Sequence, residues 1–125
     1  MPDWSASGYD QELSDRWLYG FYSPSWRRLK FGLVLRESHL RARLNEVRRV
    51  SKMPDLEMVW SRCLTSMSHE EAEHVEAATR LWLARSGSFR FIGKVDWLAV
   101  ADNVGDFSEL LNGAVDAAQS FGPDG

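Results

Sequence analysis

The stretch from Trp17 to Val50, WLYGFYSPSWRRLKFGLVLRESHLRARLNEVRRV, constrains the fold more than any other part of the chain. Its first six residues are mostly aromatic, which suits a half-buried strand, and Ser-Pro-Ser then marks a turn. Residues 29–34 form a second strand-like run. Ser38 can cap a helix that runs from His39 to about Val50. The stretch therefore predicts two strands joined by a turn and followed by a basic helix.

The rest of the chain alternates between the two kinds of pattern. Residues 56–65 predict a third strand, and Ser68-His69-Glu70-Glu71 is a capping box that begins a second long helix. Residues 88–100 predict a segment that packs along the sheet or adds a short fourth strand, and a last helix begins at Asp106. The predicted class is α+β, with a small, mostly antiparallel sheet of three to four strands flanked by three helices.

Length and composition favour a single globular domain. The chain has 125 residues, which is the size of one domain. We expect an N-terminal arm over residues 1–15, one domain over 16–121 and a polar tail over 122–125. No apolar run is long enough to cross a membrane, and the N-terminus does not resemble a secretory signal. With a single cysteine, Cys63, no internal disulfide forms, and a cytoplasmic location is expected.

Charge is distributed unevenly along the chain. The net charge is −3, yet residues 16–52 hold ten Lys or Arg and only two Glu. Such segregation is typical of an anion-binding face opposite an acidic face. The alternative is that the basic helix pairs with the acidic helices inside the fold.

Arg43 occupies an unusual place in the basic helix. Leu40, Leu44 and Val47 share one face at helical spacing, and Arg43 falls at the edge of that apolar stripe. A charge near a core edge requires an anion or access to water. One interpretation is a structural ion pair or a side chain that extends to solvent. The other is an arginine that binds an anion in a cleft between helix and sheet.

Glu76 has a similar place in the second long helix, next to the apolar stripe that contains Ala72 and Thr79. It could face the same cleft as Arg43. The structural alternative is an ion pair with Arg80, four residues later, which would contribute only about 0.3–0.5 kcal/mol.

The order of these residues resembles the GIY-YIG nuclease superfamily, in the phage and bacterial branch whose second motif is often Lys-Ile-Gly. The resemblance is carried by Tyr19, Lys30-Phe31-Gly32, Arg43-Leu44, Glu76 and Asp96-Trp97-Leu98, and it covers roughly Leu18 to Val100. The first motif departs from the family pattern, because it reads Leu18-Tyr19-Gly20. In the second motif, Lys30 stands where the family has tyrosine.

The resemblance implies a metal-dependent endonuclease that hydrolyses nucleic acid, DNA rather than RNA. Tyr19 would position or activate water, Arg43 would bind the scissile phosphate, and Lys30 would donate to phosphate. Glu76 would hold a single Mg²⁺ or Mn²⁺ ion, with water and phosphate as its other ligands.

A non-catalytic function on the same fold is the alternative. Such a module would bind nucleic acid, with a steep dependence on salt, through Arg27, Arg28, Arg36, Arg41, Arg48 and Arg49. A third possibility is a protein partner bound on the acidic face, which comprises residues 70–76 and the last helix.

Overall fold

The computed structural model describes residues 13–92, 97–102 and 104–123. The predicted arm therefore lies mostly outside the described residues, although residues 14 and 15 already belong to the first strand. The last helix ends at Phe121, where the predicted domain ends. The elements, in chain order, are β1 (Ser14–Ser23), β2 (Arg28–Val34), α2 (His39–Ser51), β3 (Glu57–Met67), α3 (His69–Arg85), β4 (Phe89–Ile92), β5 (Trp97–Val100) and α4 (Phe107–Phe121).

The strands form one antiparallel sheet in the order β3-β1-β2-β5-β4. The predicted α+β class is confirmed, but the predicted number of strands was too low. The segment expected to give at most one short strand gives two, β4 and β5, which pair with Phe91 opposite Leu98. Each of these strands is only four residues long, so their period-2 pattern was too short to separate in the sequence.

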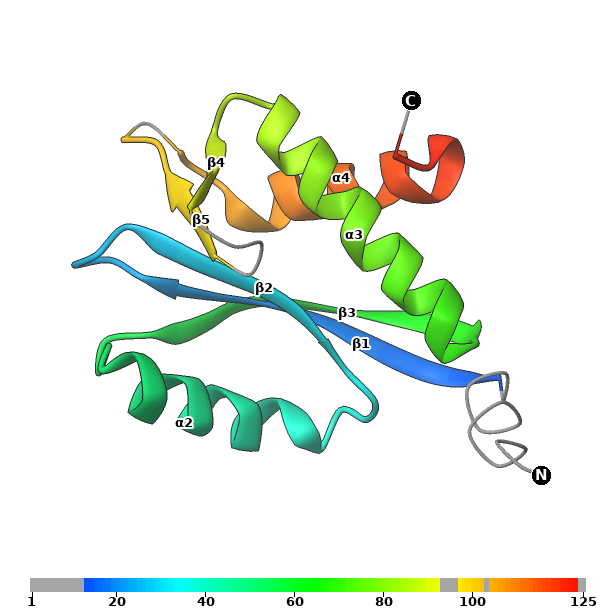
Figure 1. Cartoon of the computed structure of the whole chain (residues 1–125), viewed down its shortest axis with the longest axis horizontal. Helices are drawn as coiled ribbons and strands as arrows, with labels where there is room; N and C mark the ends of the chain where they lie inside the picture. Colours follow the sequence, from blue (N-terminus) through cyan, green and yellow to red (C-terminus); the bar gives the residue numbers. More distant parts are fainter. Residues whose placement is uncertain (1–12, 93–96, 103, 124–125) are drawn as a thin grey trace.

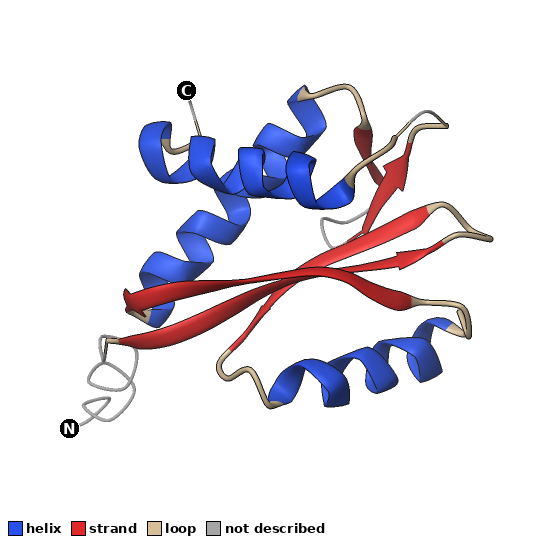
Figure 2. Ribbon diagram, turned by 180° about the vertical axis from the view of Figure 1, so that it is seen from behind, coloured by secondary structure: helices blue, strands red, loops and turns tan. Residues whose placement is uncertain are grey.

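The sheet is covered by helices on both faces (Figure 1; Figure 2). Helix α2 lies alone on one face, and α3 and α4 lie together on the other. Because side chains alternate along a strand, Tyr19 and Phe21 of β1 point to α2, whereas Leu18 points to α3 and α4. Residues 18–21 of this central strand are all buried. The basic α2 and the acidic α3 therefore do not pair with each other in the fold.

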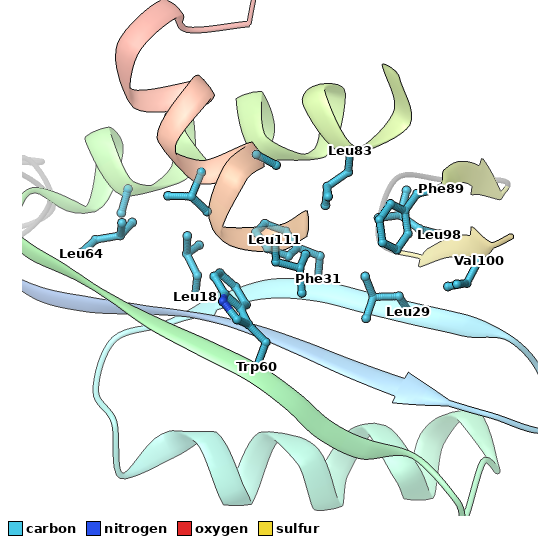
Figure 3. Packing of buried hydrophobic residues seen from close by; sticks show 13 residues of the cluster. Leu18, Leu29, Phe31, Trp60, Leu64, Leu83, Phe89, Leu98, Val100 and Leu111 are labelled. Carbon is cyan, nitrogen blue, oxygen red and sulfur yellow. The ribbon is translucent and has the colours of Figure 1, made fainter. Parts of the chain in front are cut away.

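The larger hydrophobic core lies between the sheet and the pair α3 and α4 (Figure 3). Phe31 and Trp60 stack there with ring centroids 5.8 Å apart. Trp60 Nε1 donates to Asn112 Oδ1 of α4 at 3.2 Å, so the indole is satisfied as well as packed. The smaller core, beneath α2, contains Tyr19, Phe21, Val34, Leu40, Leu44, Val47 and Leu56.

The helix ends follow local signals to different degrees. The capping box of α3 is complete, because Ser68 accepts from Glu71 N and Glu71 accepts from Ser68 N. The expected cap of α2 was wrong: Ser38 precedes the helix but has helical backbone angles and makes no side-chain capping bond. Its hydroxyl cannot accept from the first turn in that conformation. Among the described residues, no helix has both the length and the apolar content needed to cross a membrane.

The tip of the β1–β2 hairpin is fixed to the loop that follows α2. Asp55 accepts from Ser23 Oγ at 2.6 Å and from Ser25 N at 2.9 Å. These hydrogen bonds lower the pKa of Asp55 from its ordinary value, with the Ser23 bond as the largest cause.

Tyr19 crosses the neighbouring strand directly above Gly32. The two residues are partners in the β1–β2 register. A Cβ atom on Gly32 would lie 2.3 Å from the Tyr19 hydroxyl oxygen and 2.4 Å from Cζ. The ring also stacks on Phe21, with centroids 4.2 Å apart. Only glycine leaves room for this arrangement.

Gly32→Ala should therefore destabilise the protein by about 1–3 kcal/mol, because a buried ring must move to admit the methyl group. Urea unfolding measures the change. Gly113→Ala is the matched control, since nothing lies within 4 Å of its Cβ position in α4. Alanine favours a helix over glycine by up to about 1 kcal/mol, so this control should be neutral or stabilising. Equal stability of Gly32→Ala and the wild type would contradict the packing described.

The hydrogen bonds that Asp55 accepts should make the free energy of unfolding decrease in acid. The folded pKa is below the unfolded one, so the carboxylate stabilises the fold above the unfolded value, near 3.8, and loses this effect as pH falls through the lower folded pKa. Unfolding of the wild type and Asp55→Asn, measured from pH 6 to about pH 2, should show a smaller loss of stability in the variant. Parallel pH profiles would mean that these hydrogen bonds contribute nothing in solution.

Candidate functional site at the open edge of β2

Strand β2 carries the second motif, and the side chains of this strand alternate between the two faces of the sheet. Its even-numbered residues, including Arg28, Lys30 and Gly32, point to the α2 face, because Val34 packs there and Phe31 packs on the opposite face. Val100 N donates to the Arg27 carbonyl at 3.1 Å. By the same alternation, the Phe31 carbonyl points to the β5 side.

Pairing between β2 and β5 ends at Lys30, which lies opposite Trp97. From Phe31 onward, none of the described strands pairs with β2 on this side. We call this segment, residues 31–34, the open edge of β2.

The hydroxyl of Tyr19 lies above the open edge. The residue belongs to β1, but its ring extends over Gly32 and brings the oxygen onto β2. The residue as a whole is 1% exposed. Tyr19 is therefore a core residue whose polar end has been carried across a strand.

Lys30 and Arg43 line one pocket of about 370 Å³ between α2, β2 and β5. Lys30 Nζ lies 5.6 Å from the centroid of the Trp97 ring, within the range of a cation–π interaction. Arg43 is partly exposed and its Nε lies 3.3 Å from Glu46 Oε1. The other lining residues are Glu46, Val47, Val50, Ser51 and Trp97.

Both interpretations of Arg43 thus have a structural counterpart. It makes a structural ion pair within its own helix, and it lines a cleft between helix and sheet together with a second cation. Among the described residues that line the pocket, two are cations and one is a carboxylate, a set that suits an anion.

Glu76 approaches β2 from the opposite face of the sheet. Its Oε2 lies 2.6 Å from Arg80 Nη2, and the two side chains are only 16% and 13% exposed. The same nitrogen of Arg80 donates to the Phe31 carbonyl at 3.4 Å. The ion pair between Glu76 and Arg80, which the sequence offered as the structural alternative, is thus present. The guanidinium of Arg80 connects Glu76 to the Phe31 carbonyl at the open edge of β2.

The expectation that Glu76 faces the same cleft as Arg43 is wrong, because Glu76 does not line the pocket that contains Arg43. The helices that carry Arg43 and Glu76 lie on opposite faces of the sheet (Figure 1). What lies between them is β2, with Lys30 and the Tyr19 hydroxyl on one face and the Phe31 carbonyl at its edge. Asp96, the first residue of the third motif, falls outside the described residues.

A metal at this position would have few protein ligands. No group of three or more His, Cys, Asp or Glu side chains suited to a metal occurs within the described ranges. Glu76 is the predicted metal ligand, and a single carboxylate with waters and a substrate phosphate is a donor set that Mg²⁺ accepts. The donor chemistry fits, with Arg80 as a competitor for one carboxylate oxygen.

The arginines predicted to bind nucleic acid differ in the contacts that their side chains make within the fold. Arg48 Nε donates to the Leu56 carbonyl at 2.7 Å, and Arg28 Nη1 donates to the Trp26 carbonyl at 3.0 Å. Arg27 forms an ion pair with Asp102. The remaining three, Arg36, Arg41 and Arg49, are exposed.

Sequence reasoning missed three contributors. Gly32 was counted only as part of a motif, although its missing side chain admits the Tyr19 ring. Trp97 was noted only in the third motif, and its contact with Lys30 arises from the pairing of β2 with β5. Arg80 was treated as an alternative to a site, and it proves to connect Glu76 to β2. Of the three, only Gly32 could have been found from the sequence, because it belongs to the second motif.

No family model, curated protein or solved structure matches this chain.

The two parts of Tyr19 should be separable by mutation. Tyr19→Ala removes a buried ring and should cost about 3–5 kcal/mol of unfolding free energy. Tyr19→Phe keeps the ring and should cost no more than about 1.5 kcal/mol, the contribution of one hydrogen bond. Urea unfolding of both variants tests this. A Phe variant as unstable as the Ala variant would show that the hydroxyl, not the ring, holds the core together.

Proposed function

We propose that this chain is a metal-dependent nuclease that hydrolyses phosphodiester bonds at the open edge of β2. The observation that carries the proposal is the Tyr19 hydroxyl above Gly32, on the same face of the strand as the positively charged pocket of Lys30 and Arg43. The close approach of the ring to Gly32 is consistent with a hydroxyl that contacts a ligand at β2.

In the proposed reaction, water attacks the phosphorus atom as the bond to the leaving oxygen breaks. Arg43 presents a planar fork that can donate two hydrogen bonds to phosphate oxygens, and Lys30 adds a point charge. The Tyr19 hydroxyl orients the attacking water. These are positioning and electrostatic effects, which supply most of the stabilisation in phosphoryl transfer.

Glu76 would hold the Mg²⁺ or Mn²⁺ ion, which supplies charge neutralisation at the phosphate when bound. Arg80 would have to release Glu76 Oε2 or share it. A guanidinium that can turn from a carboxylate to a phosphate oxygen is consistent with this role, because arginine forms bidentate hydrogen bonds with both groups.

A second candidate is a module that binds nucleic acid without cleaving it. The observation that favours it is the short ion pair between Glu76 and Arg80, which already satisfies the carboxylate oxygen that a metal would use. Binding would then depend on the exposed arginines of the hairpin and α2. A protein partner on the acidic face is less favoured, since Glu71 is used in the α3 cap and Asp116 pairs with Arg62 at 2.8 Å.

The nuclease proposal predicts that the purified protein nicks plasmid DNA in the presence of Mg²⁺ or Mn²⁺. Arg43→Ala and Glu76→Gln should each lower the rate by about 10²–10³-fold, the effect of removing one essential electrostatic contact. The matched controls are Arg90→Ala on β4 and Glu73→Gln on α3, both exposed residues away from the pocket. These controls should cleave at the wild-type rate.

The result also separates the two candidates. Cleavage that survives Arg43→Ala or Glu76→Gln in a folded protein would rule out the proposed site. Binding without metal-dependent cleavage, weakened by each exposed arginine that is removed, would support the non-catalytic module. Its signature is a steep decrease of affinity with salt, because each phosphate contact releases a counterion.

A further inference from the structure

The turn between β1 and β2 exposes a tryptophan that precedes two arginines. Trp26 is 56% exposed, although burying a tryptophan is one of the largest sources of hydrophobic stabilisation. Arg27 and Arg28 follow it directly. Because an indole and guanidinium groups together suit a base and its phosphate, this grouping has the chemistry of a nucleic-acid contact.

The turn is held rigidly rather than left loose. Asp55 binds Ser23 and Ser25, Ser23 Oγ accepts from Trp26 N at 3.4 Å, and Arg28 Nη1 donates to the Trp26 carbonyl at 3.0 Å. The backbone on both sides of the indole is thus fixed by side chains. A preorganised platform loses little conformational entropy when a ligand binds.

The turn lies at one end of β2, and the pocket lined by Lys30 and Arg43 lies farther along the same strand. Arg28 and Lys30 point to the same face of β2 and are about 6.6 Å apart along the strand, and the Tyr19 hydroxyl follows above Gly32. Positive charge therefore runs from the exposed tryptophan to the pocket. A strand of nucleic acid whose phosphate occupies the pocket would extend toward the turn along this line.

We infer that Trp26 is a stacking platform for an unpaired base, and that the protein binds single-stranded DNA between the β1–β2 turn and the pocket lined by Lys30 and Arg43. The inference deepens the proposed function, since it names the form of nucleic acid that the same site would receive. Stacking on an aromatic face tolerates any base, so no sequence preference is expected at this position. A base paired within a duplex has its faces covered and cannot use the platform.

The test measures binding of a fluorescent single-stranded oligonucleotide by anisotropy, in EDTA so that no cleavage occurs. Trp26→Ala should weaken binding about 5- to 150-fold, the effect of losing one stacked base. Trp26→Phe should recover much of the loss because it restores a π face. The matched control is Phe121→Ala, which removes an exposed aromatic from the end of α4 and should leave the affinity unchanged.

Two further readouts distinguish stacking from a loss of charge or of fold. The slope of log affinity against log salt should be the same for Trp26→Ala and the wild type, whereas Arg28→Ala should reduce it by about 0.7. Affinity for a duplex of the same sequence should be unaffected by Trp26→Ala. Urea unfolding of each variant shows that the fold is retained, as expected for an exposed side chain.

The outcomes separate this inference from the nuclease proposal. Unchanged single-strand affinity in Trp26→Ala, or an equal loss with duplex, would overturn the stacking platform and leave metal-dependent cleavage at Arg43 and Glu76 untouched. Lack of any single-strand binding by the wild type would also overturn it. Binding that depends on Trp26 in a protein that never cleaves would retain the platform and remove the nuclease proposal alone.

Discussion

The contact between the Tyr19 ring and the backbone of Gly32 sets the register on which the rest of the structure depends. Tyr19 is opposite Gly32 in the β1–β2 pairing, and the ring has no space above any residue with a Cβ atom. A slip of one residue would bring Phe31 or Leu33 beneath the ring. It would also move every side chain of β2 to the opposite face of the sheet. One close approach therefore fixes which side chains reach each of the two cores, and it also carries a hydroxyl to the edge of the sheet.

The sheet also separates the charges. The basic α2 and the acidic α3 lie on opposite faces, so neither neutralises the other by direct packing. The asymmetry seen along the sequence is preserved in space, with exposed arginines on α2 and exposed glutamates at the start of α3. A surface with this distribution attracts an anion to one side of the molecule.

The candidate residues lie on both faces of β2. A strand is thin compared with a helix, and its backbone is accessible from both faces where no neighbour pairs with it. Lys30 and Arg43 approach from one side, and the Glu76–Arg80 pair approaches from the other and contacts the Phe31 carbonyl. This geometry differs from a cleft lined by two helices on the same face, which the sequence alone had suggested.

The sequence by itself determined the elements whose periodicity is long or whose caps are strong. The two strands predicted at residues 17–22 and 29–34, the basic helix and the box that begins at Ser68 follow from local patterns, because alternation and capping act over a few residues. The structure extends these strands to residues 14–23 and 28–34. Alternation along the first strand also puts Trp17, Tyr19 and Phe21 on one face, and they meet in the core beneath α2. Tertiary structure alone decided that residues 88–100 form two strands, since strands of four residues gain their stability from partners distant in sequence. It likewise decided that Arg80 connects Glu76 to β2, and that Arg43 and Glu76 approach from different faces, because helix placement depends on which face of the sheet each apolar stripe covers.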